Sequence, residues 1–180
     1  STMIITISGR PGSGKSVVAK ALAKRLDIPH FSAGDFERDL ARKRKMDVVA
    51  LSRLAETDRS INRMIDERTV ELSHHEFSFV MDGRMAWKFI PSSVKVLLEV
   101  SVKEGAKRLK MRESKRFRTI AAAERELKER VRCERAQYRA QYGVDFLAKK
   151  NYDVVIDTSK LSVDEVVDRI LAFARERDVT

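Results

Sequence analysis

The sequence of 180 residues has very little of several residue types that mark whole classes of protein. Its one cysteine, Cys133, excludes an internal disulfide and any metal cluster built from cysteines. There are no low-complexity segments or internal repeats, and the apolar runs are far too short to span a membrane. No basic stretch leads into a long apolar run at the start, so no signal peptide is expected. These features together predict a cytoplasmic protein.

The composition is that of a globular domain with an uneven charge. Hydrophobic residues make up 43% and charged residues 36%, and the length predicts a single domain. The net charge is +10, and residues 103–150 hold 16 Lys and Arg against 7 Asp and Glu. Such a segment suits nucleic acid or the clustered phosphates of small nucleotides. It has few aromatic residues for base stacking, which argues against nucleic acid.

The start of the chain carries a motif that lies between a predicted strand and a predicted helix. Residues 3–8 form an apolar, β-branched run that predicts a buried strand, and residues 17–26 have apolar positions at helical spacing. The eight residues between them match G-x-x-x-x-G-K-[ST], the phosphate-binding loop. The predicted ATP-binding residues are Gly9, Arg10, Pro11, Gly12, Ser13, Gly14, Lys15, Ser16 and Val17.

The chemistry of this motif follows from its residue types. Its three glycines let the backbone turn tightly, so that successive N–H groups point inward at a helix N-terminus and bind anions. We expect Lys15 to contact the β- and γ-phosphates, and the Ser16 hydroxyl to be a ligand of Mg²⁺. The motif therefore predicts ATP and Mg²⁺ as cofactors.

Strands and helices alternate along the rest of the chain. Further strands are predicted at 28–32, 77–81, 94–100 and 152–157, with a turn at 33–35 and a helix that begins near Asp35. This alternation predicts an α/β fold with a parallel sheet of about five strands, covered by helices on both faces. About forty residues between the second and third strands look helical, which predicts an inserted helical subdomain beside the phosphate loop.

A second phosphate-site element follows the third predicted strand. Four apolar positions lead into Asp82, Gly83 and Arg84, and in such a pattern the carboxylate holds Mg²⁺, usually through water. In a parallel α/β sheet, ligands bind at the carboxyl ends of the strands. We therefore expect Asp82 and Arg84 beside the phosphate loop.

Five segments carry motifs in one consistent order. They are residues 4–16, 31–36, 80–84, 142–145 and 152–159. Together they resemble the cytidylate kinase family in its short archaeal-type branch, over essentially the whole chain. Ser-Ala-Gly-Asp at 32–35 combined with Asp-Gly-Arg at 82–84 is much more specific than the phosphate loop alone.

The resemblance implies the fold of P-loop nucleoside monophosphate kinases, a three-layer α/β/α domain over residues 1–180. It implies a monophosphate-binding insertion at residues 33–75 and a helical lid at residues 112–139, both with approximate bounds. The implied reaction converts ATP and CMP or dCMP to ADP and the diphosphate. The implied partners are these nucleotides, with neither a membrane nor nucleic acid, and the expected state is a monomer.

The resemblance also implies roles for individual residues. Acceptor-binding positions would be Ser32, Gly34, Arg38, Asp82, Gly83 and Arg84. Catalytic positions would be Lys15 and the lid candidates Arg112, Arg130 and Arg135. Ser16 and Asp82 would be the metal positions.

One part of the lid departs from the family pattern. The family carries an acid followed by adjacent arginines before a tyrosine, whereas this chain has Glu134, Arg135, Ala136, Gln137 and Tyr138. Three alternatives stay open. The first is a kinase of another acceptor, such as UMP, AMP or a non-nucleotide, and the second is a P-loop protein that binds nucleic acid. The third, which the altered lid suggests, is a degraded kinase that binds nucleotide and turns over poorly.

Overall fold

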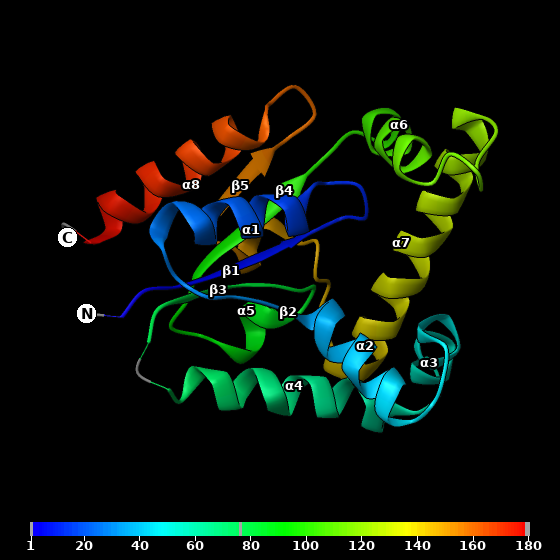
Figure 1. Ribbon diagram of the computed structural model, residues 1–180, viewed down its shortest axis with the longest axis horizontal. Helices are drawn as coiled ribbons and strands as arrows, with labels where there is room; N and C mark the ends of the chain where they lie inside the picture. Colours follow the sequence, from blue (N-terminus) through cyan, green and yellow to red (C-terminus); the bar gives the residue numbers. More distant parts are fainter. Residues whose placement is uncertain (1, 76, 179–180) are drawn as a thin grey trace.

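The computed structural model describes residues 2–75 and 77–178, and its centre is a five-stranded parallel sheet. The strand order is β2-β3-β1-β4-β5, which confirms the predicted fold class (Figure 1). The strands are β1 (Ile4–Gly9), β2 (His30–Ser32), β3 (Phe79–Asp82), β4 (Val94–Glu99) and β5 (Val154–Asp157).

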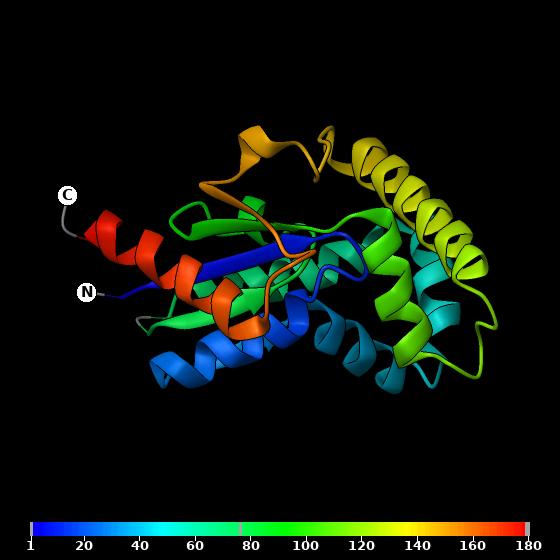
Figure 2. The same cartoon turned by 90° about the horizontal axis from the view of Figure 1, so that it is seen from above.

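Both faces of the sheet are covered. Helices α1 (Lys15–Leu26) and α8 (Val163–Asp178) pack on one face, where Ile5 and Ile7 of β1 are fully buried. Helices α4 (Arg59–Ser73) and α5 (Ala86–Phe89) lie toward the other face, against Phe79 and Met81 of β3 (Figure 2). The alternation along each strand thus divides the apolar side chains between two cores.

The strand register brings the carboxyl ends of three strands together. Ser32 at the end of β2 lies opposite Asp82 at the end of β3, and Asp82 lies opposite Ile7 near the end of β1. The phosphate loop follows β1 directly. Residues that are far apart in the sequence therefore share one edge of the sheet, where parallel α/β folds bind ligands.

Three helices connect β2 to β3, in agreement with the predicted helical insertion. They are α2 (Ala33–Lys43), α3 (Val48–Ala55) and α4. The turn expected at residues 33–35 is wrong, because α2 already begins at Ala33. The Ser32 hydroxyl accepts a hydrogen bond from the Gly34 N–H at 3.2 Å, which caps this helix end.

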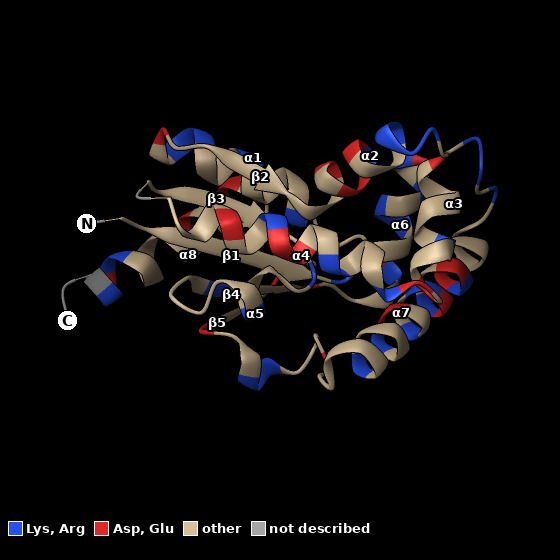
Figure 3. Ribbon diagram, turned by 90° about the horizontal axis from the view of Figure 1, so that it is seen from below, with Lys and Arg blue, Asp and Glu red and all other residues tan. Residues whose placement is uncertain are grey.

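The long helix α7 (Ile120–Tyr142) makes up most of the lid predicted at residues 112–139. The preceding helix α6 (Val102–Arg112) ends where that range begins and packs against α7 through Ala106, Leu109 and Leu127. Figure 1 shows α7 standing beyond the edge of the sheet that carries the phosphate loop, next to α2 and α3. Lys and Arg gather on α6, on α7 and on the connection between them (Figure 3).

Several predicted boundaries differ by two residues from the structure. Helix α1 begins at Lys15, β2 at His30, β3 at Phe79 and β5 at Val154. These strands begin where a neighbouring strand is available for pairing, which sequence pattern alone does not encode; Phe79, for example, pairs with Ile4. Within residues 2–75 and 77–178, no helix combines the length and the apolar character needed to cross a membrane.

Candidate active site

The phosphate loop has the backbone shape that its glycines predict. Gly12 and Gly14 have φ angles of +81° and +86°, in the left-handed region that favours glycine. Gly9 lies so close to β4 that a Cβ there would be 2.6 Å from the Leu98 carbonyl oxygen. No side chain caps the start of α1, so its first N–H groups stay available for an anion.

Asp82 is the carboxylate at the centre of the site, and its side chain is 1% exposed. Its Oδ1 lies 3.7 Å from Lys15 Nζ and accepts hydrogen bonds from Ser32 at 3.2 Å and Ser16 at 3.4 Å. Its Oδ2 lies 2.5 Å from His30 Nε2. Burial opposes the charge, but the His30 hydrogen bond and Lys15 outweigh it and keep the pKa of Asp82 below its usual value.

The oxygen atoms of Ser16 and Asp82 fit a hard cation. A hydroxyl and a carboxylate lie side by side at the phosphate loop, and Mg²⁺ prefers oxygen ligands while keeping several waters and substrate phosphates. Among the described residues, no group of three or more His, Cys, Asp or Glu side chains has the arrangement of a metal cage. A site with one or two protein ligands, completed by phosphate and water, is the kind of magnesium site that these residues offer.

Three cations converge beside this carboxylate. Burial is the largest influence on Lys15, and the charges of Arg84 and Arg130 add to it, so that its pKa falls to about 7. Arg84 donates from Nε to Glu134 Oε2 at 2.9 Å, and Arg130 Nε lies 3.4 Å from Glu134 Oε1. We call Lys15, Asp82, Arg84, Arg130 and Glu134 the charged cluster. It has three cations and two carboxylates, so it would be stabilised by an added anion.

The lid candidates occupy different environments. Arg130 belongs to the charged cluster. Arg135 instead forms a bidentate pair with Asp145, at 3.1 and 2.6 Å, and Arg112 is exposed at the end of α6. Gln137, at a position where the family pattern has an arginine, donates from Nε2 to the Ala55 carbonyl of α3 at 3.3 Å. The structure therefore brings one of the three predicted lid arginines, Arg130, to Glu134 of the charged cluster.

The predicted acceptor residues are only partly gathered. Ser32 and Asp82 are hydrogen bonded, and Arg84 reaches the same region through the charged cluster. Gly83 is tightly packed, since a Cβ there would lie 2.9 Å from the Ala33 Cβ. Arg38 is exposed and pairs with Asp35 on its own helix, and its guanidinium lies over Gly34, close to the Ser32 hydroxyl.

Two residues of the site were missed by sequence reasoning. His30 lies on the same face of β2 as Ser32, two residues away, so the period of a strand offered a signal for it. Arg108 of α6 donates to the Gly12 carbonyl at 3.1 Å and to the Thr158 carbonyl at 2.7 Å. The Thr158 hydroxyl in turn donates to the Ser13 carbonyl at 2.9 Å. Arg108 and Thr158 thus brace the phosphate loop. Thr158 lies in the motif at residues 152–159, whereas no sequence motif includes Arg108.

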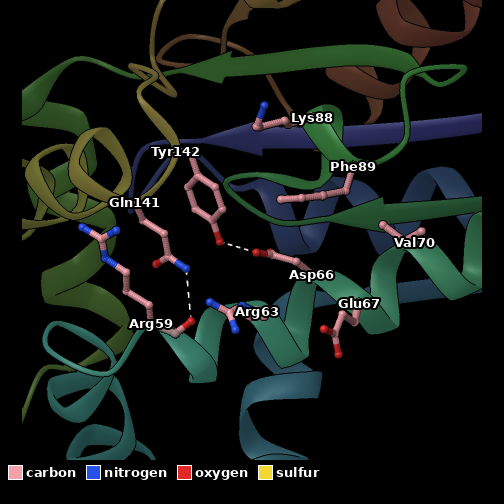
Figure 4. Close-up of a pocket in the computed structure, with 9 residues that line it drawn as sticks. All are labelled: Arg59, Arg63, Asp66, Glu67, Val70, Lys88, Phe89, Gln141 and Tyr142. Atoms are coloured by element: carbon pink, nitrogen blue, oxygen red, sulfur yellow. Dashed lines mark hydrogen bonds between the residues drawn. The ribbon is translucent and has the colours of Figure 1, made fainter.

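A cavity of about 440 Å³ lies outside this site, between α4, α5 and the end of α7 (Figure 4). Tyr142 donates its hydroxyl hydrogen to Asp66 Oδ2 across it, and Gln141 Nε2 donates to the Arg59 carbonyl at 3.2 Å. Burial is the main reason why the pKa of Asp66 rises to about 6. None of the predicted site residues lines this cavity, and its contacts join the helical insertion to the end of the lid helix.

Known proteins resemble this chain in sequence and in fold. The sequence model of the cytidylate kinase-like family matches residues 4–160. A cytidylate kinase of Methanothermobacter thermautotrophicus is 36% identical, over 90% of this chain and 99% of that protein. A cytidylate kinase of Methanocella arvoryzae is 39% identical, over 88% and 89%. Among solved structures, a shikimate kinase from Acinetobacter baumannii has a TM-score of 0.66 at 15% identity, covering 100% of this chain and 97% of its own. That likeness concerns the fold alone.

Proposed function

This chain belongs to the cytidylate kinase-like family, and from that membership we propose that it transfers the γ-phosphoryl group of ATP to CMP or dCMP. The observation that carries the proposal is the charged cluster. Three cations meet at the phosphate loop, and the pKa of Lys15 is lowered to about 7 by burial and by the neighbouring arginines. Phosphoryl transfer between two nucleotides brings several negative charges to one place, and such a cluster stabilises them.

We assign the donor side to the phosphate loop. The backbone N–H groups of residues 9–17 and the Lys15 ammonium would hold the β- and γ-phosphates. Ser16 and Asp82 would hold Mg²⁺, which neutralises charge on the phosphates when it is bound. Arg108 and Thr158 would keep the loop in its binding shape, because they fix its carbonyl groups from outside.

The acceptor side would lie between the ends of β2 and β3 and the helical insertion. Arg84 offers a planar guanidinium that can bind an acceptor phosphate in a bidentate manner. Ser32 and Asp82 are adjacent to it at the same edge of the sheet. In this proposal Arg38 would contact the acceptor from its place over Gly34, close to Ser32.

We propose that Arg130 is the lid arginine at the transferring phosphoryl group. It is the lid candidate whose charge acts on Lys15, and it projects from α7 toward Arg84 through their shared partner Glu134. Arg135 would have a structural role on Asp145. With Arg130 at the site, the replacement of expected arginines by Ala136 and Gln137 does not by itself imply a degraded kinase.

A coupled assay of ADP release tests the proposal. Wild-type protein would be given ATP and Mg²⁺ with CMP, dCMP, UMP, dUMP, AMP or GMP as the acceptor. We expect turnover with CMP and dCMP, and little with the purine monophosphates. Arg84→Ala should lose the turnover of CMP and dCMP. The control Arg116→Ala should keep it, because the Arg116 side chain is 57% exposed beside Glu126. If no monophosphate is phosphorylated while ATP still binds, the proposal is rejected.

Every group named for the reaction comes from one chain, so we also propose that the monomer is active. Its nucleotide substrates are those of the cytoplasm, where we expect it to act. Analytical ultracentrifugation at the assay concentrations tests whether the protein is a monomer.

A further inference from the structure

Helix α2 carries a carboxylate on the face that points into the molecule. Ala33, Glu37 and Ala41 recur every four residues and so share this face. Ala33 lies against Gly83 at the end of β3, and Ala41 is 3% exposed in the core with Leu51 of α3. Glu37 lies between these two contacts and is half-buried. Its side chain has no hydrogen bond or ion pair with any described residue.

Tyr138 lies one turn along α7 from Glu134, the carboxylate that pairs with Arg84. Its ring packs edge-on against Phe146, with centroids 5.4 Å apart. Burial raises the pKa of its hydroxyl, and among the carboxylates that add to this effect are those of Glu134 and Glu37. Its hydroxyl has no hydrogen-bond partner among the described residues and is not sealed from solvent. Glu37 on α2 and Tyr138 on α7 are thus two polar groups without a hydrogen-bond partner among the described residues, and the charge of Glu37 acts on the tyrosine hydroxyl.

The two groups lie beyond the acceptor-phosphate end of the site. Ser32, which caps α2, is hydrogen bonded to Asp82, and Glu37 follows it at about 7.5 Å along the helix axis. Tyr138 is also close enough to Arg84 for the arginine charge to act on its hydroxyl. A monophosphate held at Arg84 would therefore extend its base along α2 toward Glu37. The oxygens of Asp82 already have protein partners, so Glu37 is the carboxylate still available to a base.

We propose that Glu37, assisted by the Tyr138 hydroxyl, reads the edge of the acceptor base and selects a base with an exocyclic amine. A carboxylate only accepts hydrogen bonds. Cytosine presents its N4 amine as a donor, and Glu and Asp are the usual acceptors for it. Uracil presents the O4 acceptor at that place, which leaves the carboxylate unpaired and repelled. This inference rests on the proposed function and names the residue that separates CMP from UMP.

The test compares kcat/KM for CMP and UMP in the wild type, Glu37→Gln and Tyr138→Phe. The amide of Glu37→Gln has nearly the same shape, but it can donate to O4 as well as accept from N4. The CMP-to-UMP ratio should fall about ten-fold or more in Glu37→Gln, by the loss of a base-discriminating hydrogen bond. Tyr138→Phe should lower it less. Calorimetric binding of CMP and UMP should show the same change in preference.

Asp39→Asn is the matched control, because it makes the same chemical change on α2 at a residue that pairs with Arg42 and Arg68 outside the site. Its ratio should equal that of the wild type. A wild-type enzyme that uses UMP as well as CMP overturns the inference, and so does an unchanged ratio in Glu37→Gln. In both cases the proposed kinase activity is not contradicted. A wild type that phosphorylates no monophosphate overturns the proposed function and this inference together.

Discussion

Arg84 at the end of β3 and Glu134 in the middle of α7 form a nearly buried ion pair, with Nε and Oε2 2.9 Å apart and side chains 14% and 18% exposed. The pair joins the sheet to the lid helix. Burial opposes both charges, but each charge stabilises the other, so the pKa of Arg84 is raised and that of Glu134 is lowered. Arg130 shares Glu134. The position of two cations in the charged cluster thus depends on one carboxylate.

Glu134→Ala should therefore be costly. Removing one partner of a largely buried pair leaves the other charge unpaired, and we expect a loss of about 2–3 kcal/mol of unfolding free energy. The control Glu126→Ala breaks a pair with Arg116 that is about half exposed, and should lose under about 1 kcal/mol. Urea unfolding measures both. Equal losses would mean that the Arg84–Glu134 pair is no more important than a surface pair.

Arg130→Ala should lower kcat by about a thousand-fold with a smaller change in KM, as for other arginines that stabilise a transferring phosphoryl group. Arg135→Ala and Arg112→Ala should each stay within about ten-fold of the wild type, because neither side chain approaches Lys15. Steady-state kinetics on the three variants decides among them. The largest loss in Arg135→Ala would refute the assignment of Arg130.

Arg108→Lys should weaken ATP binding while leaving the KM for the acceptor almost unchanged. Lysine keeps the charge but cannot bridge the Gly12 and Thr158 carbonyls with a planar fork, so the phosphate loop loses part of its support. We expect the KM for ATP to rise about ten-fold, the effect of roughly one lost charged hydrogen bond. Arg116→Lys on the lid surface is the control. An equal rise in the acceptor KM would indicate general misfolding of the site.

Asp66 predicts a pH dependence of stability. Its pKa in the folded protein is raised to about 6 by burial. Its contribution to the free energy of unfolding is therefore fully present below the unfolded pKa near 4, and it is lost as the pH rises through 6. Asp66→Asn does not titrate. Its stability relative to the wild type should therefore increase by about 1–2 kcal/mol between pH 4 and pH 7, after allowance for partial exposure.

Asp58 should make the stability change with pH in the opposite direction. Its pKa is lowered by the hydrogen bonds from Ser60 at the start of α4, so its contribution is present at neutral pH and is lost on acidification. Asp58→Asn should therefore lose stability relative to the wild type as the pH rises. Chemical unfolding at several pH values measures both differences, and parallel pH curves for wild type and Asp66→Asn would contradict the account.

The sequence predicted the parts of the site that depend on local pattern. The glycines of the phosphate loop need their left-handed backbone angles wherever they occur, and Asp82 follows an apolar strand whose place in a parallel sheet is fixed by general rules. It did not predict which lid arginine joins the charged cluster at Glu134, because that depends on the rotation of α7 against α2 and α3. Arg108 was missed because its partners are set by helix packing across the molecule. The strand period places His30 on the face of Ser32, but it does not show that Asp82 lies opposite.

The most direct measurement of the central claim is the transfer of phosphate itself. The protein would be incubated with Mg²⁺, CMP and ATP labelled at the γ-phosphate, and the labelled products separated by chromatography. The account predicts labelled CDP, abolished in Lys15→Met, because the charged cluster would then lack the cation at the phosphate loop. Label found only in inorganic phosphate, with no CDP, would contradict it and identify an ATPase instead of a kinase.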